Sequence, residues 1–141
     1  MAVREPTPQD ATAVARLLAE LGYPASDGQA AERLERLSRD ESYRVFVAEL
    51  DGEIAGFATV HVMSLIERDE PGAVLAAIAV TERFRRRGVG SALVGAVEAH
   101  ARARGASRLV LSSARKRADA HAFYLRAGFE HTGLRFVKEL R

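Results

Sequence analysis

The sequence predicts an α+β fold built on a mixed, mostly antiparallel sheet. Two strand-like segments flank Asp51-Gly52, a dipeptide typical of an antiparallel hairpin turn. Further on, residues 73–111 hold an apolar segment, a long amphipathic segment and a second short apolar segment. That order indicates two parallel strands joined by a helix. Because the two kinds of connection occur together, a doubly wound parallel fold is excluded.

The N-terminal part is predicted to form a short strand at 2–5 and two helices. Thr7 and Pro8 are typical of a helix start, since threonine caps a helix and proline suits its first position. Apolar residues then recur at helical spacing until Gly22, which ends the helix. Ser26 or Asp27 opens the second helix.

The remaining elements follow from alternating strand formers, amphipathic spacing and glycine stops. The predicted strands are Tyr43–Leu50, Glu53–Met63, Ala73–Val80 and Leu109–Leu111, with one or two more in the tail Phe129–Leu140. The predicted later helices are Val89–Arg104 and Ala118–Arg126, and Ile66–Gly72 and Arg83–Gly88 are loops. The element order is therefore β-α-α-β-β-β-α-β-α-β.

Composition restricts the function. A chain of 141 residues with 48% hydrophobic side chains suits a single domain, residues 1–141. The absence of cysteine excludes a disulfide framework, a thiol nucleophile and cysteine metal sites. Met1–Pro6 has no apolar signal core and no segment is apolar enough to span a membrane, so we expect a cytoplasmic protein without membrane contact. A net charge of +2 argues against a general nucleic-acid binder.

The positive charge is nevertheless clustered. Four of the five residues from Arg83 to Arg87 are arginine, and Arg115-Lys116-Arg117 is a second cluster. Glycines at 88 and 90 follow the first cluster where a strand gives way to a helix. Unpaired N–H groups at a helix start, glycines and arginines together suit a phosphate or pyrophosphate. An arginine-rich surface turn that caps the helix is the simpler alternative.

Two motifs give a specific resemblance. Arg85, Gly88 and Gly90 match the Arg/Gln-x-x-Gly-x-Gly/Ala signature with which the GNAT superfamily of N-acetyltransferases binds acetyl-CoA. The segment Ala120–Phe129 resembles the late A-x-x-F-Y-x-x-x-G-F motif of the same family. The resemblance implies a three-layer fold with helices on both faces of the sheet. It also implies a splayed pair formed by the fourth and fifth strands, and acetyl-CoA as cosubstrate.

The resemblance also assigns residues. Backbone N–H groups at 86–91 would hold the pyrophosphate, the central strand would pair with the pantetheine arm, and the late helix would line the other wall. The implied cofactor-binding residues are Ile78, Ala79, Val80, Arg85, Arg86, Arg87, Gly88, Val89, Gly90, Ser91, Ala120 and Phe123. A backbone N–H of Ala79 or Val80 would stabilise the oxyanion.

Catalysis requires that the amine lose a proton and that the departing thiolate be stabilised. The resemblance assigns the second task to Tyr124. Many relatives carry a glutamate on the central strand for the first task, but this strand has none. Glu67 in the preceding loop can act through water or bind a cationic acceptor. The structural alternative for Tyr124 is a packing role in an amphipathic helix, and for Glu67 it is a place on the solvated surface.

The expected reaction is acetyl transfer from acetyl-CoA to a primary amine by direct attack in a ternary complex. The turn Leu21–Pro24 resembles a small-molecule branch of the superfamily, which includes aminoalkylphosphonate and aminoglycoside acetylators. Protein N-termini or lysines, a non-catalytic acetyl-CoA-binding module and a nucleic-acid-binding module are the alternatives. The four histidines show no metal-ligand spacing, and His61 lies on a strand that can face the acceptor cleft. A homodimer is left open.

Overall fold

The computed structural model describes residues 1–112, 118–133 and 136–140. Within them, the strands are β1 (Ala2–Arg4), β2 (Tyr43–Leu50), β3 (Glu53–Met63), β4 (Gly72–Val80) and β5 (Leu109–Leu111). The helices are the 3-10 turns η1 (Pro8–Asp10) and η2 (Glu82–Phe84), and α1 (Ala11–Leu21), α2 (Asp27–Ser38), α3 (Val89–Ala103) and α4 (Ala118–Arg126). The chain divides into two compact units, Met1–Leu111 and Ser112–Arg141. No helix in the described residues is long and apolar enough to cross a membrane.

The five strands of the first unit form one sheet in the order β1-β2-β3-β4-β5. The first four strands pair antiparallel, and β5 pairs parallel with β4 after the α3 crossover. Asp51 and Gly52 join β2 to β3 with positive φ values of 54° and 78°. Two consecutive positive φ angles match the twist of antiparallel strands, which is why Asp-Gly is favoured in such turns. The predicted mixed sheet is confirmed.

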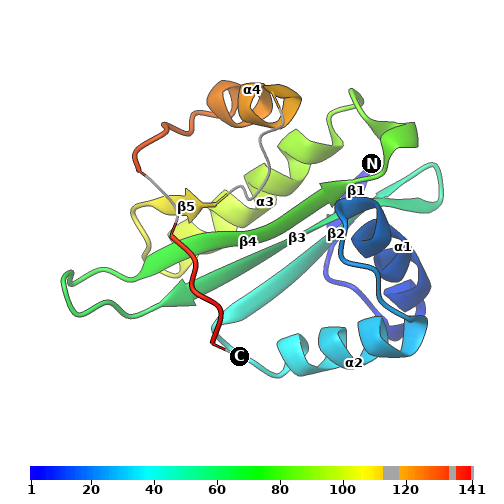
Figure 1. Cartoon of the computed structure of the whole chain (residues 1–141), viewed down its shortest axis with the longest axis horizontal. Helices are drawn as coiled ribbons and strands as arrows, with labels where there is room; N and C mark the ends of the chain where they lie inside the picture. The colour runs from blue at the N-terminus through cyan, green and yellow to red at the C-terminus, as the bar shows by residue number, and fades with distance from the viewer. Residues whose placement is uncertain (113–117, 134–135, 141) are drawn as a thin grey trace. The chain divides into compact units, whose positions relative to one another are not determined.

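Helices α1 and α2 cover one face of the sheet (Figure 1). Ser26 caps α2, since its hydroxyl accepts from the backbone N–H of Gln29 at 3.0 Å, and the Gln29 side chain accepts from the Ser26 N–H at 2.9 Å. The two helices bury an apolar cluster against the middle of the sheet, with Leu17 1% exposed at its centre. The cluster includes Val14, Ala15, Leu17, Ala30, Val47, Ile54, Phe57 and Ala79.

Helix α3 lies on the opposite face, where Gly56 of β3 allows it to approach closely. A Cβ atom at Gly56 would lie 2.7 Å from the carbonyl oxygen of Ala79 and 3.1–3.2 Å from side-chain carbons of Leu93 and Val89. No side chain larger than hydrogen fits at that distance. The glycine thereby fixes the first turns of α3 against β3 and β4.

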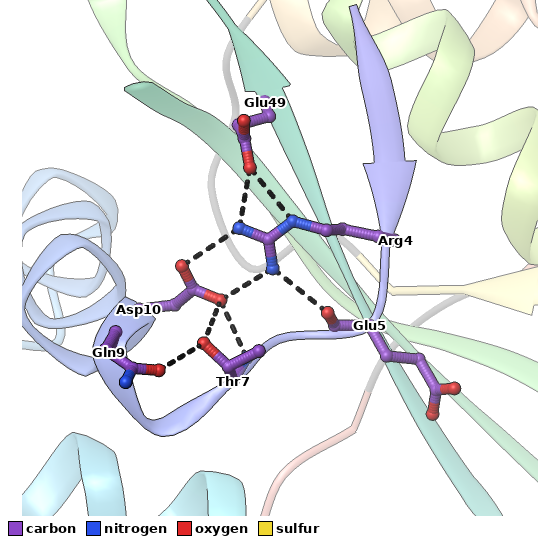
Figure 2. Close-up of polar contacts among 6 residues, drawn as sticks. All are labelled: Arg4, Glu5, Thr7, Gln9, Asp10 and Glu49. Atoms are coloured by element: carbon purple, nitrogen blue, oxygen red, sulfur yellow. Dashed lines mark hydrogen bonds and ion pairs between the residues drawn. The ribbon is translucent and has the colours of Figure 1, made fainter. Parts of the chain in front are cut away.

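A network of charged groups ties β1 to the start of α1 (Figure 2). The Arg4 guanidinium donates to Asp10 at 2.8 Å and to Glu49 of β2 at 2.7 Å. Asp10 also accepts from the backbone N–H of Thr7 at 2.7 Å, so it caps η1. The helix predicted to start at Thr7 therefore begins with a 3-10 turn that leads directly into α1.

The second unit contains α4 and the tail. Gly128 ends α4 with a left-handed φ of 95°, and the N–H of Phe129 donates to the carbonyl of Tyr124 at 3.0 Å, as the glycine predicted. The strands expected in 129–140 are absent from its described residues, and positions 134 and 135 lie outside them. Phe136 and Val137 are strand formers but are 88% and 65% exposed. Strand propensity alone gives no strand without a partner edge and a buried face.

Candidate active site

Strands β4 and β5 pair only over three residues. Ala73, Val74 and Leu75 lie opposite Leu109–Leu111, and β4 then continues to Val80 with no described strand on that side. Figure 1 shows β4 extending past the end of β5 towards the start of α3. The predicted splayed pair is therefore confirmed. Backbone N–H and C=O groups along Ile78–Val80 face the side that β5 has left, so an extended ligand can pair with them.

A β-bulge lies where the two strands part. Thr59 of β3 is opposite Ala77 and Val60 is opposite Leu75, so Ala76 is an extra residue on β4. A bulge bends its strand and increases the local twist. Because the bulge follows Leu75 directly, it falls at the residue where β4 leaves β5.

The backbone of the loop between η2 and α3 has a conformation that suits an anion. Arg86 and Gly88 both adopt positive φ values, 65° and 81°. Left-handed residues alternating with ordinary ones turn successive N–H groups towards one point, a geometry that binds anions. Gly88 is also the N-cap of α3 and offers no capping side chain, so the N–H groups of the first turn stay available. Val89 is buried, which restricts it to a backbone contribution, whereas Ser91 is exposed.

The four arginines of this loop divide into two pairs. Arg83 and Arg87 lie over the ring of Phe84 at 4.7 and 5.6 Å, and they form ion pairs with Glu53 and Asp51 of the β2–β3 hairpin. Arg85 and Arg86 are exposed and have no hydrogen-bond or ion-pair partner among the described residues. The first pair shapes the loop, and the second is available to a ligand. The second basic cluster, Arg115-Lys116-Arg117, lies outside the described residues.

Two further residues, Phe84 and Glu20, hold the loop and were not predicted from the sequence. Phe84 is 5% exposed and anchors the otherwise exposed segment to the core. Glu20, in the last turn of α1, accepts from the hydroxyl of Thr81 at 2.9 Å and from the backbone N–H of Glu82 at 3.2 Å. Phe84 could have been predicted as an anchor, because it is a single apolar residue among arginines. No sequence pattern indicates the role of Glu20, because its hydrogen-bond partners are 61 and 62 residues away.

The acidic loop before β4 lies at the other end of that strand. Glu67 is exposed between β3 and β4, and the strand from Gly72 to Ile78 spans roughly 20 Å. The structure therefore does not bring Glu67 together with Ile78–Val80. Its neighbour Glu70 is held by its own backbone N–H and by the Arg68 guanidinium, which keep the pKa of that carboxyl below its usual range.

The late motif is described within its own unit. Ala120, Phe123 and Tyr124 lie on one face of α4 at helical spacing, and all three are half-buried. The Phe123 and Tyr124 rings meet edge to face at 5.7 Å, and Tyr124 meets Phe129 in the same way at 6.0 Å. These contacts fix the direction of the Tyr124 ring on its helix.

The first unit thus combines three features that fit one kind of ligand. The α3 start and its loop suit a pyrophosphate, two arginines add positive charge, and the unpaired edge of β4 suits an extended amide-bearing arm. Coenzyme A has these parts in this order. No group of three or more potential metal-ligating side chains occurs among the residues that the structure describes.

Comparison with known proteins agrees with this site. Residues 12–129 match the model of the acetyltransferase (GNAT) family, a match that runs through both units. The chain is 32% identical to an aminoalkylphosphonate N-acetyltransferase of Salmonella typhimurium over 98% of this chain and 90% of that protein. It is 33% identical to an aminoglycoside N(6')-acetyltransferase type 1 of Stenotrophomonas maltophilia over 92% of this chain and 86% of that protein.

A solved structure shows the same fold. The aminoglycoside N-acetyltransferase AAC(6')-Iy, in complex with CoA, superposes with a TM-score of 0.85 at 22% identity, covering 99% of this chain and 94% of that one. The family match and the two curated relatives carry the assignment beyond the fold. The chain therefore belongs to the acetyltransferase (GNAT) family and is an acetyl-CoA-dependent N-acetyltransferase.

Proposed function

We propose that this protein transfers the acetyl group of acetyl-CoA to a primary amine of a small molecule. The anion-binding α3 start next to the unpaired edge of β4 carries the proposal, because it fits the cosubstrate. The names of the two curated relatives support a small acceptor, since one acts on aminoalkylphosphonates and the other on aminoglycosides.

In the proposed complex, each part of the site has one task. Arg85, Arg86 and the N–H groups from Arg87 to Ser91 bind the pyrophosphate. The backbone of Ile78–Val80 pairs with the pantetheine arm as an added strand. Ala120 and Phe123 line the opposite wall, an assignment that comes from the family motif.

The proposed chemistry is direct attack of a neutral amine on the thioester carbon. The chain has no cysteine, so no acetylated thiol of the protein can precede transfer. A backbone N–H of β4 stabilises the negative charge on the carbonyl oxygen. Tyr124 donates a hydrogen bond to the departing sulfur. Tyrosine is a weaker acid than a thiol, so a hydrogen bond stabilises the thiolate without requiring full proton transfer.

We propose a limited role for Glu67. Its exposure and its position at the far end of β4 favour attraction of a cationic acceptor over contact with the reacting nitrogen. Glu67→Gln should then raise the KM for a polycationic amine and leave kcat unchanged.

An acceptor screen tests the proposal. Purified protein is incubated with acetyl-CoA and 2-aminoethylphosphonate, kanamycin, a peptide with a free N-terminus or a lysine peptide with a blocked N-terminus. Thiol release is then measured. We expect turnover with a small amine and intersecting initial-velocity lines. Turnover of peptides alone would favour a protein acetyltransferase, and acetyl-CoA binding without any turnover would favour a non-catalytic module.

Tyr124→Phe tests the leaving-group role. Loss of the hydroxyl should lower kcat by about 100-fold, the usual size of such a contribution, with little change in acetyl-CoA binding. Calorimetry and thermal unfolding check binding and folding. Unchanged turnover would remove Tyr124 from the mechanism.

A further inference from the structure

The position of the reacting atoms follows from the proposed function, on which this inference rests. A thiol arm that starts at the α3 N-terminus and runs along β4 passes Val80 before Ile78. It cannot continue beyond Leu75, where β5 closes against β4. The thioester therefore lies near Ala76 and Ala77, at the bulge. Both residues are small, and Ala76 is exposed.

One titratable side chain lies beside this position. In the β3–β4 register, Thr59 is opposite Ala77 and His61 is opposite Val74, so the two β3 residues flank the bulge. Side chains alternate along a strand, so His61 and Thr59 share the face of Phe57, which packs under α1 and α2. Adjacent strands are about 4.8 Å apart, so the backbone of β3 lies roughly 10 Å from an arm paired on the far edge of β4. The His61 side chain projects from the same side of the sheet as Thr59 and reaches across part of this distance, which leaves room for the acceptor amine or one water molecule between the imidazole and the thioester.

The surroundings of His61 keep its ring in place without occupying its nitrogen atoms. The ring stacks on Tyr43, its cross-strand neighbour in β2, with centroids 4.2 Å apart and planes 11° apart. His61 is half-buried, and neither nitrogen has a hydrogen-bond partner within the described part of the chain. Residues Ala58, Val60 and Val62 of the opposite face are buried, so only the His61 face opens to an acceptor.

The charged groups around His61 are few. Asp40, in the loop before β2, faces it, and the Ser42 hydroxyl and N–H, followed by the charge of His61, hold the pKa of Asp40 below its usual range. Tyr43 packs against it from β2, and its nearest neighbours on β3 and β4, Thr59 and Val74, carry no titrating acid or base.

We infer that His61 removes the proton from the acceptor ammonium, directly or through one water molecule. The ammonium gives one proton to an imidazole nitrogen, which passes it to solvent. The amine nitrogen then bonds to the thioester carbon as the carbon–sulfur bond breaks. A second proton of the amine is transferred to the departing sulfur, so that CoA leaves as the thiol. Histidine suits this task because its charge changes between pH 5 and 8. The central strand carries no glutamate that could do the same.

The test compares His61→Gln with wild type on a small amine that the acceptor screen shows to be turned over. We expect kcat/KM for the amine to fall about 100-fold at pH 7, while the KM for acetyl-CoA stays within about twofold. The rising limb of the pH–rate profile should shift to higher pH, towards the pKa of the free amine. His131→Gln, at an exposed histidine of the tail, is the matched control and should behave as wild type.

A second measurement separates proton removal from packing. A fluorinated analogue of the acceptor, whose amine is already neutral at pH 7, needs no base. With this analogue, His61→Gln should lower kcat/KM less than tenfold. Tyr43→Phe keeps the stacked ring and should retain the rate, whereas Tyr43→Ala should lower it. An equal loss with both amines, or no loss with either, would overturn the inference. If wild type turns over no amine in the screen, the proposed function itself fails.

Discussion

At the scale of single residues, the clearest stabilising contact is the Arg4–Asp10 pair (Figure 2). Asp10 is the buried charged residue of the described structure, at 7% exposure. The Arg4 guanidinium, followed by the N–H and hydroxyl of Thr7, holds the pKa of Asp10 below its usual range. The Arg4 guanidinium joins β1 to η1, a few residues further along the chain, and to Glu49 of β2, 45 residues away. Its removal therefore loosens the N-terminal edge of the sheet.

Asp10→Asn should lower the free energy of unfolding by about 2 kcal/mol at pH 7, because a charge-assisted hydrogen bond is lost and Arg4 keeps Glu49 as its remaining carboxylate partner. The pKa of Asp10 is depressed in the folded state, so its contribution is present above the unfolded value of about 3.9 and is lost as pH falls through the folded value. Urea unfolding between pH 2.5 and 7 measures this. Asp69→Asn, at an exposed aspartate, should change little. Parallel pH profiles for wild type and Asp10→Asn would contradict the assignment.

At the scale of elements, several residues together fix the position of the start of α3. Gly56 sets the distance of the helix from the sheet, and Gly88 sets the direction of the chain into it. Phe84 and Glu20 hold the preceding turn from two other sides. The loop thus needs no ligand to adopt its shape, which lowers the ordering cost of binding a polyphosphate.

Gly88→Ala tests this geometry. A Cβ at Gly88 meets no atom within 4 Å, so the cost arises from the left-handed φ, about 1–2 kcal/mol. Acetyl-CoA affinity should fall as the loop relaxes to another conformation. Gly95→Ala is the matched control in the same helix, since Gly95 is also unobstructed but has no positive φ. It should stabilise by about 0.5–1 kcal/mol. Equal effects in calorimetry and thermal unfolding would argue against a special role for Gly88.

Glu20→Ala tests the link between α1 and η2. The loss of its hydrogen bonds to Thr81 and Glu82 should raise the KM for acetyl-CoA roughly fivefold, equivalent to about 1 kcal/mol, with kcat little changed. Glu20→Gln keeps an acceptor oxygen and should restore most of the affinity. Glu32→Ala, on the exposed side of α2, serves as control. A fall in kcat without a change in KM would show that Glu20 acts in another way.

At the scale of the whole molecule, charge distribution matters more than net charge. A chain with a net charge of +2 is a poor match for a long polyanion, but Arg85 and Arg86 face solvent at one anion-binding loop. One compact polyphosphate ligand suits that arrangement. Its binding should also stabilise the fold, since it favours the native state by mass action.

Acetyl-CoA at 100 times its Kd should raise Tm by roughly 10 °C, from about 2.7 kcal/mol of binding free energy acting on a domain of this size. Replacing both Arg85 and Arg86 with Ala should remove most of that shift at the same ligand concentration. Arg16→Ala, on exposed α1 surface, should keep it. Duplex DNA should give no comparable shift. A larger shift with DNA than with acetyl-CoA would favour the nucleic-acid alternative.

Most elements could be predicted because their signals are local. Ser26, Gly88 and the Asp51-Gly52 turn act within a few residues of chain, and the structure confirms each. The strands predicted in the tail are absent from its described residues, because Phe136 and Val137 favour a strand only where a partner edge and a buried face exist. Glu67 lies apart from Ile78–Val80 because it precedes β4, and most of this extended strand separates the two.

The sequence by itself determined the order of elements up to α4 and the left-handed glycine at the start of α3, because these depend on local backbone preferences. The family resemblance implied the splayed strands. Only the tertiary structure decided that Arg83 and Arg87 pair with Glu53 and Asp51 of the β2–β3 hairpin while Arg85 and Arg86 remain available. It alone brought Glu20 to Thr81 and His61 to the bulge. Such contacts join residues far apart in the chain, and strand register and helix packing, which no local pattern encodes, decide which of them meet.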